Sequence, residues 1–124
     1  MSLRPVTVLI VEDDCLTGLG YRIGLEEAGH SVLALARTGE QAMRLAGLYR
    51  PSHVIIDLRL KGPMDGIDVA HELERLYPCH VIFATGVADR RTLELLASLK
   101  SIAILVKPLR FNAFSRLFGN PAPA

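Results

Sequence analysis

The stretch "VLIVEDDCL", residues 8–16, joins an apolar run to a cluster of acids. The run Val8–Val11 has strand length, and an uninterrupted apolar run of this kind is typical of a strand buried on both faces. Glu12, Asp13 and Asp14 follow directly. Asp14 suits the cap of a following helix, but a cap does not explain the other two carboxylates. A buried strand that ends at adjacent acids therefore indicates a functional site at that end of the strand.

Further apolar runs alternate with segments of helical periodicity along the chain. The predicted strands are Val6–Val11, Ser31–Ala36, Val54–Asp57, Val81–Thr85 and Ile102–Val106. Strict alternation of strands and helices predicts a doubly wound α/β fold, with a mostly parallel sheet covered by helices on both faces. Ligands of such folds bind beyond the carboxyl ends of the strands.

A helix is predicted after each strand. In the first, Leu16, Leu19 and Ile23 share one face, which we expect to be the apolar face. Gly29 is expected just after the C-terminus of this helix. The signals of the later helices are capping-box spacing from Thr38 to Gln41, an apolar stripe from Val69 to Tyr77, a cap at Asp89, and an apolar face from Phe111 to Phe118.

Composition narrows the class of protein. The 124 residues suit one compact domain, and a net charge of +1 without a basic run predicts no nucleic-acid partner. No apolar run approaches the roughly 20 residues that span a bilayer, and the N-terminus lacks a signal peptide. Cys15 and Cys79 form no CxxC motif, which favours free thiols in a reducing compartment. We therefore expect a cytoplasmic protein with no membrane partner.

Polar side chains gather at the predicted carboxyl ends of the strands. Asp57 ends the third strand, Thr85 ends the fourth, and Lys107 follows the fifth, so all three join Glu12 and Asp13 at one edge. Two carboxylates about 4 Å apart repel by about 1 kcal/mol in water and by about 4 kcal/mol at an effective dielectric of 20. Magnesium prefers oxygen ligands and removes this penalty. The pattern therefore predicts a Mg²⁺ site.

The motifs "VLIVEDD", "HVIIDLRL", "MDGIDVA", "VIFATG" and "ILVKPL" occur in this order. With them the sequence resembles a response-regulator receiver domain of two-component signalling, from about Thr7 to Phe118. The resemblance implies the flavodoxin-like (βα)5 fold, whose five parallel strands have the order 2-1-3-4-5. We expect a single receiver domain over residues 1–124, with a core at about 6–118 and a tail at 119–124, and no attached output domain.

The resemblance also implies roles for the acids. Asp57 would accept a phosphoryl group from a phosphohistidine, carried by a sensor histidine kinase or a histidine phosphotransfer protein. Glu12, Asp13, Asp57 and the backbone carbonyl of Arg59 would bind Mg²⁺. The domain would be a signalling phosphoacceptor that catalyses only its own phosphorylation and dephosphorylation.

Two further roles follow from the same resemblance. Lys107 would pair with the phosphoryl group, next to a cis bond to Pro108. Thr85 would move its hydroxyl onto a phosphoryl oxygen and so shift the face formed by the fourth helix, the fifth strand and the fifth helix. That face would contact a downstream protein target.

The sequence departs from the family pattern in three places. Ile104 stands where the family has Tyr or Phe, which affects the expected coupling from Thr85 to the output face. The loop "DLRLKGPMDG" is one residue longer than is common, and Arg59 places a cation beside the acids.

The sequence argues against three other classes of protein. Gly18, Gly20 and Gly24 form GxGxxxG rather than the dinucleotide fingerprint GxGxxG, and the acidic turn before them would repel a pyrophosphate or an FMN phosphate. A metal-dependent phosphatase of this fold would need a second Asp where Arg59 stands. The remaining alternative is a receiver-fold interaction module that signals without phosphorylation.

Overall fold

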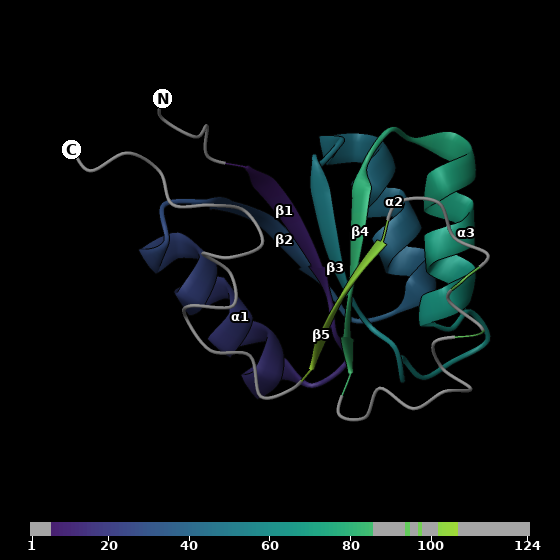
Figure 1. Ribbon diagram of the computed structural model, residues 1–124, viewed down its shortest axis with the longest axis horizontal. Coiled ribbons are helices and arrows are strands. Elements are labelled where there is room, and N and C mark those ends of the chain that lie inside the picture. The colour runs from purple at the N-terminus through teal and green to yellow at the C-terminus, as the bar shows by residue number, and fades with distance from the viewer. Residues whose placement is uncertain (1–5, 86–93, 95–96, 98–101, 107–124) are drawn as a thin grey trace.

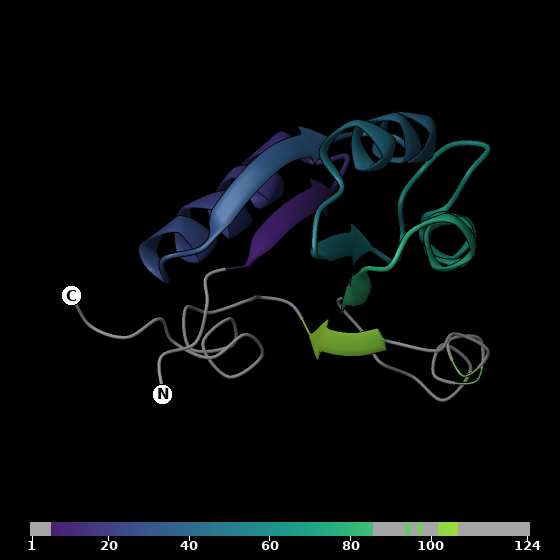
Figure 2. The same ribbon diagram turned by 90° about the horizontal axis from the view of Figure 1, so that it is seen from above.

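The structure is a computed structural model that describes residues 6–85, 94, 97 and 102–106, with the backbone alone for residues 85 and 102–106. The elements are β1 (Thr7–Val11), α1 (Cys15–Glu27), β2 (Ser31–Ala36), α2 (Gly39–Tyr49), β3 (His53–Asp57), α3 (Gly66–Leu76), β4 (His80–Thr85) and β5 (Ile102–Val106). The five-stranded sheet has the order β2-β1-β3-β4-β5, and every neighbouring pair is parallel. Helix α1 covers one face, and α2 and α3 cover the other (Figure 1 and Figure 2). The predicted doubly wound α/β fold is confirmed.

The strand register brings the carboxyl ends of the strands to one edge. Val11 of β1 pairs with Ile56 of β3, so that Glu12 and Asp57 leave the sheet side by side. Asp57 in turn pairs with Ala84 of β4, one residue before the end of that strand. This register places the acids that follow β1 next to the acid that ends β3.

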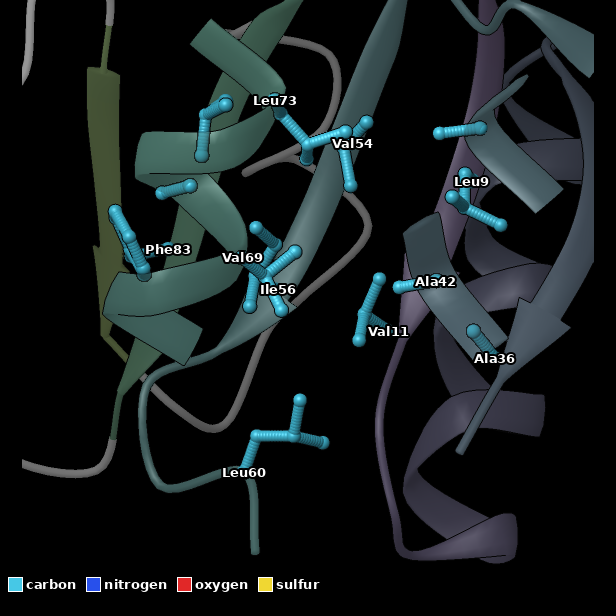
Figure 3. Close-up of a cluster of buried hydrophobic side chains, with 13 residues drawn as sticks. Leu9, Val11, Ala36, Ala42, Val54, Ile56, Leu60, Val69, Leu73 and Phe83 are labelled. Carbon is cyan, nitrogen blue, oxygen red and sulfur yellow. The ribbon is translucent and has the colours of Figure 1, made fainter. Parts of the chain in front are cut away.

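Each face of the sheet carries its own hydrophobic core. Between the sheet and the α2–α3 pair lie Leu9, Val11, Ala36, Ala42, Ala46, Val54, Ile56, Leu60, Val69, Ala70, Leu73, Val81 and Phe83 (Figure 3). Beneath α1 lie Val8, Ile10, Tyr21, Leu25, Ile55, Ile82 and Ala84. Full burial of a large apolar side chain stabilises the fold by about 1.5–3 kcal/mol. Leu60 is the member that comes from a loop, the one after β3, so this core also holds the segment next to Asp57.

The helix ends agree only partly with the sequence signals. Thr38 caps α2 by accepting from the Gln41 N–H at 3.1 Å, but the Gln41 side chain accepts from the Arg37 N–H at 2.7 Å. Gln41 therefore does not complete the capping box with Thr38. The reciprocal box occurs at α3, where Asp65 and Asp68 each accept from the other's backbone N–H. The sequence spacing did not single out that pair.

The prediction of which face of α1 is buried was wrong. Leu16, Leu19 and Ile23 are 80%, 46% and 51% exposed. The helix instead packs through the face that contains Gly18 and Tyr21. A Cβ at Gly18 would lie 3.0 Å from Leu35 Cδ2, so the missing side chain lets α1 approach β2 on this side. The predicted glycine after the helix is confirmed, because Gly29 follows the cap residue Ala28 with φ +91°.

Several predictions fall outside the described residues. These are the cap at Asp89 with most of the helix after it, where residues 94 and 97 are described and exposed, the helix over Phe111–Phe118, the bond from Lys107 to Pro108, and the tail at 119–124. Within the part of the chain that the structure describes, no helix combines the length and the apolar character needed to cross a bilayer.

Candidate functional site: an acidic pocket at the carboxyl edge of the sheet

The three acids after β1 separate as the chain enters α1. Asp14 caps the helix: its carboxylate accepts from the Leu16 N–H at 3.3 Å and from the Thr17 hydroxyl at 2.6 Å. Glu12 turns the other way and is only 3% exposed. Its backbone N–H donates to the Ala36 carbonyl at 2.9 Å, which continues the β1–β2 ladder by one residue. One acid of the run thus serves the helix, while Glu12 lies in the interior.

Asp57 is held at the end of β3 by its own turn. Oδ1 of its carboxylate accepts from the Arg59 N–H at 3.0 Å, and its carbonyl accepts from the Leu60 N–H at 3.2 Å. The Leu58 N–H donates to the Ala84 carbonyl of β4 at 3.2 Å. The side chain is 7% exposed. Because the carboxylate is hydrogen-bonded to the backbone of the turn of residues 57–60, the position of this turn sets the direction of the carboxylate.

Glu12, Asp13 and Asp57 meet in one group. One carboxylate oxygen from each lies within 4.8 Å of the others. Burial raises the pKa of Glu12 to about 7, and contact with the Asp57 and Asp13 carboxyls adds to this rise, while the Asp14 N–H opposes it. Burial and neighbouring negative charges both disfavour the ionised form of a carboxyl group and so raise its pKa. The pocket therefore gathers three carboxyl groups, and the ionisation of Glu12 among them is disfavoured.

The group fits a hard divalent cation. Carboxylate and carbonyl oxygens suit Mg²⁺, which takes one or two carboxylates and completes its shell with water or phosphate oxygens. Of the predicted ligand set, the structure brings together the carboxylates of Glu12, Asp13 and Asp57. Arg59 lies two residues beyond Asp57 in the same turn, with an exposed side chain that forms no ion pair with the three acids.

The other predicted site residues are described in part or not at all. Thr85 ends β4 at the same edge and pairs with Val106 of β5, but the structure describes only its backbone. Ile104 pairs with Phe83, likewise as backbone. Lys107 lies outside the described residues.

Two residues that shape this site were missed in the sequence. Leu60 is 3% exposed in the core, although it lies in the loop after Asp57. Gly66 begins α3, and a Cβ there would lie 2.5 Å from the Asp57 carbonyl oxygen. The signal for Gly66 was its place directly after the cap residue Asp65, in the quoted motif "MDGIDVA". No spacing rule, however, links it to a strand end nine residues earlier.

Comparison with known proteins agrees with this geometry. The family described as the response regulator receiver domain matches residues 8–117. The chain is 33% identical over 108 residues to the transcriptional regulatory protein PdtaR of Mycobacterium tuberculosis, across 87% of this chain and 52% of that protein. It is 35% identical over 108 residues to the positive alginate biosynthesis regulatory protein of Pseudomonas aeruginosa, across 85% of this chain and 42% of that protein.

A solved structure is similar over nearly the whole chain. It is the signal receiver domain of a modulated diguanylate cyclase from Desulfovibrio desulfuricans, with a TM-score of 0.84 and 33% identity, covering 91% of this chain and 90% of that one. The chain spans about half the length of the curated relatives named above. Both of these relatives are named as regulatory proteins. On fold, acidic pocket and sequence together, this chain belongs to the response-regulator receiver domain family of two-component signalling.

Proposed function

We propose that this chain is a phosphoacceptor receiver in which Asp57 takes a phosphoryl group from a phosphohistidine with the help of Mg²⁺. The observation that carries the proposal is the convergence of Glu12, Asp13 and Asp57 within 4.8 Å at the carboxyl edge of the sheet. A buried carboxylate beside two others suits a nucleophile that works with a bound cation.

The proposed phosphoryl transfer forms one P–O bond and breaks one P–N bond. A carboxylate oxygen of Asp57 attacks phosphorus, the P–N bond to the partner's imidazole breaks, and its electron pair stays on the ring nitrogen. The product is an aspartyl phosphate. Positioning and charge stabilisation account for most of the catalysis in such transfers.

Each described residue has a part in this scheme. The Arg59 N–H donates to Oδ1 of Asp57 at 3.0 Å and fixes the orientation of the carboxylate that would act as the nucleophile. Glu12, Asp13, Asp57 and the Arg59 carbonyl would hold Mg²⁺, which supplies charge neutralisation between the nucleophile and the phosphoryl oxygens. By family resemblance, Lys107 would pair with the phosphoryl group and Thr85 would bind it after transfer.

The partners follow from this chemistry. The donor would be a sensor histidine kinase or a histidine phosphotransfer protein, and the output would pass to a protein target through the face of the fourth helix, β5 and the fifth helix. We assign residues 6–118 to one receiver domain, acting in the cytoplasm without direct contact to nucleic acid or membrane.

Phosphorylation in vitro tests the proposal. The protein is incubated with acetyl phosphate or phosphoramidate and Mg²⁺, and its intact mass is measured beside that of Asp57→Asn. We expect a gain of about 80 Da, one phosphoryl group, in the wild type, and none in Asp57→Asn or in wild type with EDTA. Equal labelling of the Asp57→Asn variant, or no labelling of folded wild type, would overturn the proposal.

One observation favours a second candidate function. Ile104 replaces the aromatic residue through which receivers couple phosphorylation to their output face. A receiver-fold module that binds its target without phosphorylation would show the same target affinity with and without the aspartyl phosphate.

A further inference from the structure

The start of α3 lies directly against the main chain of the phosphoacceptor. A Cβ built on Gly66 would lie 2.5 Å from the Asp57 carbonyl oxygen and 3.3 Å from Leu58 Cα. It would also lie 3.1 Å from Ile56 Cγ2. Two of these three neighbours are backbone atoms, which cannot rotate away as the end of a side chain can. Glycine at residue 66 is therefore what permits this approach.

The surroundings decide which part would yield to a larger residue. Helix α3 is anchored by Val69 and Leu73, both 0% exposed in the core. Strand β3 lies in the middle of the sheet, hydrogen-bonded to β1 and β4. Between these two fixed elements lies the peptide group that joins Asp57 to Leu58. Its N–H donates to the Ala84 carbonyl and its carbonyl accepts from the Leu60 N–H, both at 3.2 Å, the long end of the range for such hydrogen bonds. A side chain at residue 66 would displace that peptide first.

That peptide also sets the direction of the Asp57 carboxylate. The Asp57 carbonyl accepts from the Leu60 N–H at 3.2 Å, and Oδ1 accepts from the Arg59 N–H at 3.0 Å. Both bonds lie within the turn of residues 57–60. A shift of the carbonyl oxygen moves the turn, and with it the donor that holds the carboxylate.

We propose that Gly66 is a positioning residue for phosphoryl transfer: its missing side chain keeps the turn of residues 57–60 where the Asp57 carboxylate faces the acidic pocket. This inference rests on the phosphoacceptor function proposed above. Gly66 touches neither the phosphoryl group nor the metal, and it acts through the main chain of Asp57.

The longer loop does not disturb this arrangement. Leu60 lies buried in the core, and Met64 packs against the start of α2, where a Cβ at Gly39 would lie 2.7 Å from the Met64 carbonyl oxygen. Between them, Gly62 adopts φ +112° with nothing within 4 Å of its Cβ position. An extra residue is therefore accommodated in an exposed segment, and the loop returns to Gly66 beside Asp57.

Alanine substitutions at three glycines separate positioning from general destabilisation. Gly66→Ala is the test. Gly39→Ala is the matched control, because its Cβ also meets backbone at under 3.0 Å, but at Met64 rather than at Asp57. Gly20→Ala is the neutral control, with nothing within 4 Å. Thermal unfolding gives the folded fraction, calorimetry gives the Mg²⁺ dissociation constant, and intact mass gives the labelling rate against acetyl phosphate concentration.

We expect folded Gly66→Ala to lose at least about tenfold in maximal labelling rate, since a displacement of about 1 Å can cost up to a hundredfold. Its Mg²⁺ binding should weaken as well. Gly39→Ala should lose stability yet stay within about twofold of wild type in both measurements, on the same positional argument.

Three results would overturn the inference. One is Gly66→Ala with wild-type rate and Mg²⁺ affinity, and another is an equal loss of rate in Gly39→Ala. The third is a Gly66→Ala chain that stays unfolded even in sucrose, because the glycine would then serve the fold. If wild type itself is not labelled, the phosphoacceptor proposal fails, and the comparison of Mg²⁺ affinities still decides whether Gly66 positions the pocket.

Discussion

Glu12 and Asp57 leave neighbouring parallel strands side by side and bring two buried carboxyl groups into one group with Asp13, with carboxylate oxygens within 4.8 Å of one another. They are 3% and 7% exposed. Burial, together with the contact between their carboxyl groups, raises the pKa of Glu12 to about 7. The arrangement therefore stores repulsion that a cation or a neutral substitution would relieve.

Asp57→Asn should stabilise the metal-free protein. Asparagine keeps an oxygen for the Arg59 N–H and removes one buried negative charge, so we expect the free energy of unfolding at pH 8 in EDTA to rise by about 1 kcal/mol. Urea denaturation measures the change. Glu27→Gln, an exposed acid of α1 away from the pocket, should change it by less than about 0.5 kcal/mol. A less stable Asp57→Asn would contradict the prediction.

Magnesium should raise the thermal stability of the wild type. A ligand that binds only the folded state adds about 1.4 kcal/mol for each tenfold rise in its concentration above the dissociation constant. Asp13→Asn should lose most of this effect, because it removes one of the three carboxylates. Melting curves in Mg²⁺ and in EDTA give the comparison, with Glu27→Gln as the variant that keeps the full response. An Asp13→Asn protein that responds like wild type would exclude Asp13 as a ligand.

Leu60→Ala should destabilise the fold by about 2–5 kcal/mol, the range for large-to-small changes in a core. Leu60 is 3% exposed although it lies in a loop, whereas Leu48 on α2 is 69% exposed. Leu48→Ala should therefore change stability by less than about 0.5 kcal/mol. Chemical denaturation of both variants measures the difference, and similar values for the two would show that the loop does not contribute to the core.

Arg50 should tolerate glycine better than alanine. It follows α2 in the left-handed region, at φ 50° and ψ 60°, and its guanidinium lies 4.6 Å from the Tyr77 ring centroid. Both substitutions remove the cation–π contact, worth about 0.5–1 kcal/mol at an exposed position. Only glycine also removes the backbone strain, of about 1 kcal/mol.

We therefore expect Arg50→Gly to equal the wild type within error and to exceed Arg50→Ala by about 1 kcal/mol. Thermal unfolding of the three proteins decides the order. If Arg50→Ala proved the more stable variant, the backbone conformation after α2 would be different from the one described.

Acid should destabilise the protein through His53. Burial, followed by the charges of His80 and His30, lowers the pKa of His53 from 6.5 to about 4. The ring centroids of His53 and His80 lie 4.9 Å apart, and the two residues pair at the starts of β3 and β4. Between pH 6.5 and pH 4 the unfolded chain binds the His53 proton and the folded chain does not, so the contribution of His53 to stability is full above this window and is lost as pH falls through it. Glu12, whose pKa is raised from 4.5 to about 7, contributes in the opposite direction between pH 7 and pH 4.5.

His53→Asn should lose less stability than the wild type between pH 6.5 and pH 4, because asparagine does not titrate and can still meet the Ser52 hydroxyl that lies 2.8 Å from the His53 ring nitrogen. His71→Asn, at an exposed position on α3, should leave this loss unchanged. Denaturation midpoints from pH 4 to pH 8 give the slopes. Parallel slopes for wild type and His53→Asn would assign the acid sensitivity to other groups.

The apolar pattern of the sequence, together with the family resemblance, was enough to predict the parallel sheet and the acidic pocket at its edge. Runs such as Val8–Val11 and the run that ends at Asp57 are apolar on both faces, which marks them as central parallel strands. Parallel strands end at a common edge, and the strand order 2-1-3-4-5 that the family resemblance implies makes the strands that end at Glu12 and Asp57 neighbours. The prediction of a shared acidic pocket needed no more than this.

The tertiary structure alone decided how neighbouring elements meet. It turned Leu16, Leu19 and Ile23 outward, because α1 approaches β2 through Gly18. It also buried Glu12 to 3% exposure, which its place in a run of three acids did not indicate. A helix with apolar residues on several sides has no preferred face until a partner surface is present.

The contact between Gly66 and Asp57 illustrates the same division. The sequence predicted that Asp57 ends a strand and that a helix follows with an apolar stripe from Val69 to Tyr77, whereas the start of this helix at Gly66 is seen in the structure. Their approach within van der Waals distance depends on the packing of α3 against the core and on the path of the loop between them. Periodicity describes each element along its own axis, whereas the distance between two elements is set by the side chains that separate them, and only the folded molecule shows which side chains those are.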